Sequence, residues 1–244
     1  MIEVKLFNEY KLKGYTLIEG FPGAGLVGPM VNSYIIEKLG MDYIGYIDSN
    51  EFPSVIAIHK GIPMFPVRLY KDDKHKLVVI IAEFTIPPEL IYELANELMN
   101  FVRKSGIKEI VSIGGMPADE PKEVAYGIAS EGSLGETLKK IGIAPIEDGV
   151  VAGVSALLLA NSQQYNIPVV ELLVQVNPQI MDPKYAVTAL INLKKLLGIE
   201  ISTDELEREA KIVEAKVRET LKRTRDSHES YKKAVDATGP SMYA

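Results

Sequence analysis

Strand-like and helix-like segments alternate along residues 1–199, and this alternation restricts the possible folds more than any other feature of the sequence. Residues Leu77–Ala82 (LVVIIA) are continuously apolar, as expected of a strand that is buried on both faces of a sheet. Residues Pro88–Lys104 then carry Leu90, Leu94 and Leu98 on one helical stripe. The alternation predicts an α/β fold in which helices sandwich a mostly parallel sheet.

The remaining elements are expected from apolar periodicity and from the glycines and prolines that separate the segments. Further strands are expected at Tyr15–Glu19, Tyr43–Ile47, Ser54–Ile58, Pro66–Tyr70, Glu109–Ile113 and Val169–Val176. Further helices are expected at Leu26–Leu39, Ser133–Ile141, Ala152–Gln164 and Pro183–Leu197. Asp182 and Gly198 should cap the last helix at its two ends. The strands on either side of Gly61 could form a hairpin.

The chain changes character after residue 199. Ser202 as N-cap and Glu205 three residues later fit a capping box. From Asp204 to Lys233, 17 of 30 residues are charged, and the apolar stripe is too thin for a core helix. The sequence therefore predicts an α/β domain at residues 1–199, a long charged C-terminal helix at 200–236 and a flexible tail at 237–244.

The composition removes several classes of function. The chain has no cysteine, which excludes disulfides, thiolate catalysis and cysteine-based zinc sites. Its three histidines are far apart, so we expect no metal site, and no cofactor is expected. The net charge of -6 argues against nucleic acid or an anionic membrane as a partner. With no signal-peptide core and no apolar run of membrane-spanning length, a cytoplasmic location is expected.

A glycine-rich turn follows the first expected strand. Within GFPGAGLVG, Gly23, Gly25 and Gly28 match the spacing G-x-G-x-x-G, which can present backbone N–H groups to a phosphate. Asp48 follows the second strand, where a dinucleotide-binding fold holds the ribose. The simpler interpretation is that the glycines let a helix pack closely on the sheet, since Pro22 and Pro29 flank them and no catalytic group accompanies them. A nucleotide- or nucleoside-binding enzyme that uses this turn is the alternative.

Two other residues occupy positions at which catalytic groups occur. Glu83 directly follows a buried strand, and Ser155 lies in a second glycine-punctuated helix entry, DGVVAGVS. Neither is accompanied by a catalytic motif, because G-x-S-x-G is absent and no histidine is near Ser155 in sequence. A strand-end or capping role for Glu83 and close packing around Ser155 are the simpler interpretations.

The last three residues combine an apolar side chain, a phenol and a carboxylate, in Met242, Tyr243 and Ala244. Capture of a C-terminal carboxylate is a known recognition mode, and tyrosine supplies rigid amphipathic contact area. On a mobile tether these groups predict a partner-binding tail. The alternative is a frayed chain end without a function.

Several motifs together resemble the archaeal members of the proteasome assembly chaperone family. They are GFPGAGLVG, EFPS from Glu51, SIGGMP and DGVVAGVSALLLA, in the order in which that family has them. The resemblance covers roughly Tyr15–Leu197. It implies an α/β fold similar to that of nucleoside phosphorylases but without their catalytic residues, so no enzyme activity is expected. It also implies homo-oligomers, with a tetramer or a pentamer expected.

The ending Met-Tyr-Ala looks like the hydrophobic-tyrosine-X motif of proteasome activators. The resemblance implies that Tyr243 wedges between adjacent α-subunits of the proteasome core particle. The carboxylate of Ala244 would pair with a pocket lysine, and Met242 would fill an apolar groove. The expected function is that of an ATP-independent activator, an assembly chaperone or both. A structural oligomer that holds a different partner through its charged helix stays open as an alternative.

Overall fold

The computed structural model describes residues 1–208 and residue 210. Its centre is a nine-stranded sheet in the order β1-β3-β6-β7-β2-β8-β11-β9-β10. The strands of this sheet are β1 (Ile2–Leu6), β2 (Thr16–Glu19), β3 (Asp42–Ser49), β6 (Val67–Asp72), β7 (Leu77–Ala82), β8 (Glu109–Pro117), β9 (Ala125–Ala129), β10 (Ala144–Pro145) and β11 (Val169–Val176). A separate hairpin pairs β4 (Ala57–His59) with β5 (Ile62–Met64).

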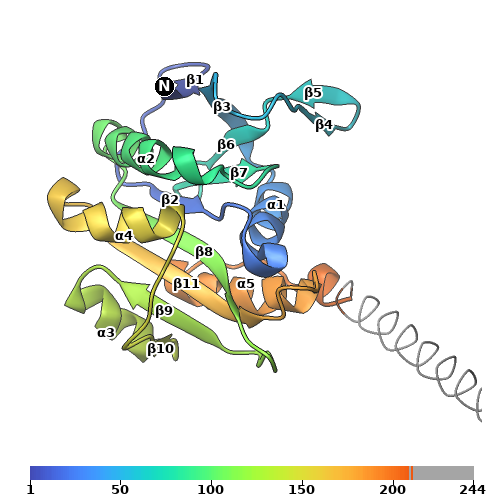
Figure 1. Cartoon of the computed structure of the whole chain (residues 1–244), viewed down its shortest axis with the longest axis vertical. Helices are drawn as coiled ribbons and strands as arrows, with labels where there is room; N and C mark the ends of the chain where they lie inside the picture. The colour runs from blue at the N-terminus through green and yellow to red at the C-terminus, as the bar shows by residue number, and fades with distance from the viewer. Residues whose placement is uncertain (209, 211–244) are drawn as a thin grey trace, which may run out of the picture.

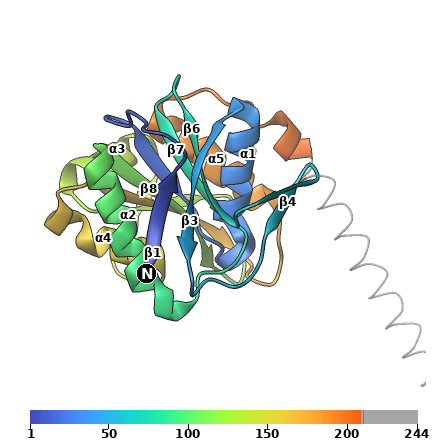
Figure 2. The same cartoon turned by 90° about the horizontal axis from the view of Figure 1, so that it is seen from above.

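Helices cover both faces of the sheet, as Figure 1 and the view from above in Figure 2 show. The helices are α1 (Val27–Leu39), α2 (Ile91–Ser105), α3 (Gly132–Lys140), α4 (Val154–Tyr165) and α5 (Pro183–Leu197). Helices α2 and α4 lie side by side on one face, and α1 and α5 lie side by side on the other. Each face has its own buried apolar cluster, so the predicted sandwich of helices around a sheet is confirmed.

The sheet is mixed rather than mostly parallel. The pairs β7–β2, β2–β8 and β8–β11 in the centre are parallel, as is β9–β10 at one edge. The other four pairs are antiparallel, including the whole run β1-β3-β6-β7. The expectation of a mostly parallel sheet therefore holds only for the centre, where helices connect the strands. Outside the centre most neighbouring strands are antiparallel, and antiparallel neighbours can be joined by short turns.

Local signals placed most element boundaries correctly. The carboxylate of Asp182 accepts a hydrogen bond of 2.9 Å from the backbone N–H of Lys184, so this residue is the predicted N-cap of α5. Gly198 ends the helix in the left-handed conformation, at a φ of 64°. The expected strand from Glu109 does not stop before Gly114. It continues to Pro117, since its partner β11 pairs with it over the whole length.

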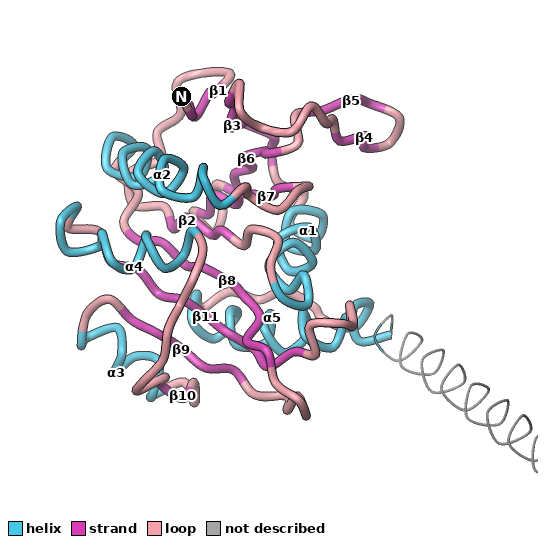
Figure 3. Tube along the Cα trace, viewed as in Figure 1, coloured by secondary structure: helices cyan, strands magenta, loops and turns pink. Residues whose placement is uncertain are grey.

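The hairpin around Gly61 forms, but from other strands than expected. Its two strands are β4 and β5, whereas residues 66–70 belong to β6 in the main sheet. The hairpin projects from the body near β3 and β6 in Figure 3. Three of its flanking or strand residues are largely exposed isoleucines: Ile56 (66%), Ile58 (71%) and Ile62 (63%). An exposed apolar surface of this kind is typical of a contact region.

The predicted capping box at Ser202 is wrong by one residue. Helical residues begin at 204, which puts Thr203 at the cap, and the Ser202 hydroxyl accepts a 3.3 Å hydrogen bond from the Asp204 N–H. Glu205 does not reach back to the cap, because it forms an ion pair with Lys38 of α1. The rest of the predicted C-terminal helix and tail, apart from residues 204–208 and 210, lies outside the described residues. Among the described residues, every helix is too short or too polar to span a lipid bilayer.

Candidate functional site

The predicted partner-binding tripeptide, Met242, Tyr243 and Ala244, lies outside the described residues. The structure does describe the segment that leads toward it. The Tyr34 hydroxyl donates a 2.9 Å hydrogen bond to the Ser202 carbonyl, and Leu206 is buried against the core on the α1 and α5 face. These contacts hold residues 202–206 against the body.

The glycine turn between β2 and α1 serves close packing. A Cβ atom on Gly28 would lie 2.5 Å from the Cα of Gly20, so the first turn of α1 touches the backbone that follows β2. Gly25 has a φ of +66°, and a Cβ there would lie 2.9 Å from the Val176 side chain. Gly23 has no comparably tight neighbour. At Gly25 and Gly28, the packing interpretation of the sequence explains the glycines.

The dinucleotide-binding arrangement is wrong, because the structure does not bring Asp48 to the glycine turn. Asp48 lies on β3, which is separated from β2 by both β6 and β7. Its carboxylate forms a 2.9 Å ion pair with the Nζ of Lys5 on the neighbouring strand β1. The strand that follows β2 in sequence, β3, therefore lies three positions away in the sheet. A ribose-binding carboxylate would be needed on the strand next to β2.

A row of buried polar residues lies in the parallel centre of the sheet instead. In the register of the sheet, Glu19 on β2 pairs with Ser112 on β8, and Ser112 pairs with Glu171 on β11. Paired residues of neighbouring strands point to the same face, here the face that α2 and α4 cover. All three side chains are at most 4% exposed. We call Glu19, Ser112 and Glu171 the carboxyl ladder.

The carboxyl ladder is only partly hydrogen-bonded. Glu19 Oε2 accepts from the Phe21 N–H at 3.3 Å, and Glu171 Oε1 accepts from the Ser155 hydroxyl at 2.8 Å. Among the described residues, four buried side-chain atoms have no hydrogen-bond partner, and three of them belong to the ladder: Glu19 Oε1, Ser112 Oγ and Glu171 Oε2. Burying such groups without partners is unfavourable, so their concentration at one place indicates a site rather than a structural network.

Burial also changes the acidity of both carboxyl groups. It raises the pKa of Glu19 to about 7, with a smaller contribution from repulsion by Glu171. The nearby Ser112 hydroxyl and the Phe21 N–H offset part of this shift. Burial raises the pKa of Glu171 as well, and the hydrogen bond from Ser155 opposes it. Carboxyl groups with raised pKa values in a cavity are a common property of binding and catalytic sites.

The two glutamates of the ladder line a cavity of about 240 Å³. Its walls come from the turn after β2, the loop before α2, the middle of β8 and the entry to α4: Phe21, Pro22, Thr85, Ile86, Gly114 and Gly153 are among them. The chain leaves β2 toward β3 and leaves β8 toward β9, in opposite directions across the sheet. Ligands of open α/β sheets bind at the carboxyl ends of strands at such a point.

The cavity lacks a recognisable catalytic set. Ser155, which is half-buried, is hydrogen-bonded to a carboxyl group rather than to a histidine, so it has no general base of the usual kind. In the described residues, no group of three or more His, Cys, Asp or Glu side chains could hold a metal ion. The other carboxylate singled out from the sequence, Glu83, pairs at 2.5 Å with the buried guanidinium of Arg68 and so has a structural role.

Sequence reasoning missed Glu19 and Glu171. A signal was present, because Glu171 interrupts the otherwise apolar start of its strand, Val169–Val174, and Glu19 ends an apolar strand. Both are unusual positions for a buried charge. The proximity of the two could not be read from the sequence, because 151 residues separate them and the register of three strands brings them together.

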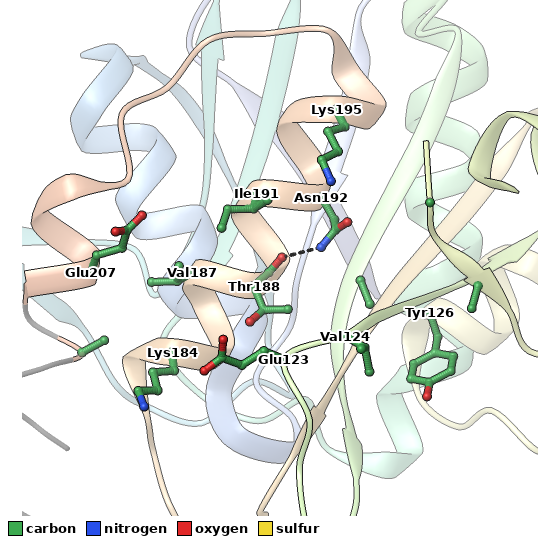
Figure 4. Close-up of a pocket in the computed structure, with 14 residues that line it drawn as sticks. Glu123, Val124, Tyr126, Lys184, Val187, Thr188, Ile191, Asn192, Lys195 and Glu207 are labelled. Atoms are coloured by element: carbon green, nitrogen blue, oxygen red, sulfur yellow. Dashed lines mark hydrogen bonds between the residues drawn. The ribbon is translucent and has the colours of Figure 1, made fainter. Parts of the chain in front are cut away.

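A second, larger cavity of about 630 Å³ lies between α5 and the β9 region. Figure 4 shows Val187 and Ile191 of α5 on the side of Glu207, with Val124 and Tyr126 on the other side. The Asn192 amide donates to the Thr188 carbonyl at 2.8 Å. None of the unpartnered buried polar atoms of the described residues lines this cavity. The carboxyl ladder is therefore the better candidate for a ligand site.

The sequence and the fold were both compared with those of known proteins. A sequence model of the PAC2 family matches residues 17–221. An uncharacterised protein of Methanocaldococcus jannaschii is 30% identical over 203 residues, which is 83% of this chain and 84% of that protein. The crystal structure of Pyrococcus furiosus PbaA, described as an archaeal homolog of proteasome-assembly chaperone, matches with a TM-score of 0.83 and 27% identity, covering 98% of this chain and 100% of PbaA. Pyrococcus furiosus PbaB, described as an archaeal proteasome activator, has the same fold, with a TM-score of 0.79, 24% identity and coverage of 90% and 98%.

Proposed function

The chain belongs to the PAC2 family, and from this premise we propose that it is a non-catalytic protein that docks on the α-ring of the proteasome core particle. It would act as an ATP-independent activator, an assembly chaperone or both. The observation that carries the proposal is the similarity to PbaA, which extends over nearly the whole of both chains. The description of PbaB as a proteasome activator agrees with it, although that likeness by itself concerns only the fold.

The docking element in this proposal is Met242–Tyr243–Ala244. Tyr243 would insert between adjacent α-subunits, where its ring supplies contact area and its hydroxyl a hydrogen bond. The carboxylate of Ala244 would pair with a lysine of the pocket in a charge-assisted contact, and Met242 would fill an apolar groove. The contacts of Ser202 and Leu206 with the body support a tail that starts from a fixed point on the α1 and α5 face.

Self-association, as a tetramer or a pentamer, is part of the proposal. One tripeptide buries little surface and should bind weakly, whereas several tails on one assembly gain effective concentration. The exposed isoleucines of the β4–β5 hairpin support it, because an apolar surface of this kind favours contact with another chain. For activation, the tails would also have to bind the open ring more tightly than the closed ring, since otherwise no population shifts.

The test is binding of the full chain to an archaeal core particle on a biosensor surface. Deletion of residues 242–244 and the substitution Tyr243→Ala should each abolish binding, and two glycines added after Ala244 should weaken it by displacing the carboxylate. Tyr92→Ala is the matched control, because Tyr92 is a largely exposed tyrosine on α2 and should bind as the unmodified chain does.

Unchanged affinity after the tail deletion would refute docking through the tail. Loss of affinity with Tyr92→Ala as well as with Tyr243→Ala would also contradict it, because the effect would then not be specific to the tail. Hydrolysis of a fluorogenic peptide by the preassembled core particle separates the two activities. An activator raises the rate, whereas a pure assembly chaperone leaves it unchanged. Recovery of other proteins and never of α-subunits would favour the structural-oligomer alternative.

A further inference from the structure

The carboxyl ladder presents two carboxylate oxygens that accept no hydrogen bond of ordinary geometry from the described chain, although the Ser112 hydroxyl is near enough to Glu19 to lower its pKa. Glu19 Oε1 and Glu171 Oε2 are buried acceptors without a partner, and Ser112 Oγ lies between their strands. A deprotonated carboxylate is an acceptor only, so the complementary group must be a donor. Two carboxyl groups in one small cavity also make it electrostatically negative when they are ionised, which excludes anions and favours a cation.

We propose that this cavity binds a small organic amine, with the ammonium group held between the carboxylates of Glu19 and Glu171. An ammonium group has three donors and one positive charge, so it can donate to both carboxylates that line the cavity at once. Hydrogen bonds between charged partners are about twice as strong as those between neutral ones. The site is independent of the tail, and its existence does not depend on docking to the proteasome.

The remaining walls of the cavity favour an organic ligand over a bare metal ion. Phe21, Ile86, Ile91 and Leu173 line it with apolar groups, which suit a hydrocarbon body beyond the ammonium group. A hard cation such as Ca²⁺ takes six to eight oxygen ligands, and this cavity offers two carboxylates. Its volume of about 240 Å³ exceeds what one ion needs.

Neighbouring residues hold the ladder in position and leave room beside it. The Ser155 hydroxyl, on the first turn of α4, fixes one oxygen of Glu171 at 2.8 Å and leaves the other without a hydrogen-bond partner. Gly114 keeps the floor of the cavity open, because a Cβ atom there would lie 3.1 Å from Leu173 and 3.8 Å from Glu171 Oε1. The segment that precedes α4 runs from β10 across the front of Figure 3 and supplies Ala152 and Gly153 to the wall.

Binding of an amine should depend on pH. Glu19 and Glu171 are the titratable side chains that line the cavity, and α2, α4 and the loop before α2 contribute Ile91, Ser155 and Thr85 over them. An amine needs the ionised form of Glu19, whose pKa is raised to about 7 by burial. Affinity should therefore rise between pH 6 and pH 8, and binding at pH 7 should release a proton from Glu19.

The experiment measures binding of n-butylamine to the full chain at pH 8 by calorimetry, with 1-butanol, butyrate, Mg²⁺ and Ca²⁺ as comparison probes. We expect saturable binding of the amine alone. Glu19→Gln and Glu171→Gln should each weaken it by about tenfold or more, because each removes one charged partner. Glu136→Gln, at an exposed position of α3, is the matched control and should bind as the unmodified chain does.

A second measurement needs no variant. Carboxyl ¹³C resonances of glutamate-labelled protein report the pKa of Glu19 directly, and saturating n-butylamine should lower that pKa. The proposal fails if neither the resonances nor the calorimetry respond to the amine, which would leave a cavity filled by water. It also fails if Mg²⁺, Ca²⁺ or butyrate binds in its place, or if amine binding persists unchanged in both glutamine variants.

Discussion

The buried Glu19 should make the stability of the fold fall with rising pH, and Glu19→Gln should remove the part of that dependence that comes from Glu19. The carboxyl group has a pKa of about 7 in the folded protein and an ordinary value of 4.5 when exposed. Between these two values the folded state keeps a proton that the unfolded chain has already released. Glutamine has the same shape and does not titrate, so the variant isolates the contribution of this one group.

The magnitude follows from proton linkage. Each pH unit between the two pKa values lowers the free energy of unfolding by about 1.4 kcal/mol. The interval from 4.5 to about 7 therefore corresponds to about 3 kcal/mol. This stability is fully present below pH 4.5, is lost progressively as the pH rises to 7, and remains lost above it. A loss of that size is a large fraction of the stability of an ordinary domain, about 5–15 kcal/mol.

The assay is urea unfolding of the unmodified chain and of Glu19→Gln at several pH values between 4.5 and 8. The difference in unfolding free energy between the two proteins should change by about 3 kcal/mol in favour of the variant across this range. Glu136→Gln should track the unmodified chain throughout. If the unfolding free energies of the unmodified chain and of Glu19→Gln change with pH in parallel, Glu19 titrates normally. The reasoning on the buried ladder would then be refuted.

Two further substitutions test the packing of the helices. Gly28→Ala should lower the unfolding free energy by about 1–3 kcal/mol, because the added Cβ would lie 2.5 Å from Gly20. Thermal melts measure the effect, and Gly132→Ala, where a Cβ would meet nothing within 4 Å, should be close to neutral. Equal destabilisation by Gly28→Ala and Gly132→Ala would contradict the steric account. Asp182→Ala should cost about 1 kcal/mol by removing the N-cap of α5, and an unchanged melting temperature would argue against that cap.

Much of the fold follows from local sequence signals, since strands and helices at Leu77–Ala82, Val169–Val176 and Pro183–Leu197 lie within a residue of their predicted positions. The resemblance drawn from the glycine motifs is confirmed by the family match and by the likeness to PbaA. The mixed sheet was not predicted, because parallel or antiparallel pairing depends on which strands meet. The short strand β9 escaped notice, since Ala125–Ala129 contains a glycine and little apolar periodicity.

The candidate site was predicted less well than the fold. The glycine turn was located correctly, but Asp48 was assigned to it on the assumption that the next strand in sequence is the next strand in the sheet. In the sheet, β6 and β7 instead lie between β2, which precedes the glycine turn, and β3, which carries Asp48. Glu19 and Glu171 meet only through the register of β2, β8 and β11, which no local pattern encodes. Glu205 was assigned to a capping box, but its carboxylate forms an ion pair with Lys38 of α1 instead.

The central claim is that the carboxyl-terminal residues contact the α-subunits of a proteasome core particle. Photo-crosslinking tests it most directly, with p-benzoylphenylalanine in place of Ser241 so that Met242, Tyr243 and Ala244 are kept. Irradiation of the mixture with an archaeal core particle should give crosslinks to α-subunits, and Tyr243→Ala in the same chain should abolish them. Crosslinks that survive Tyr243→Ala, or that form only with other proteins, would contradict the account.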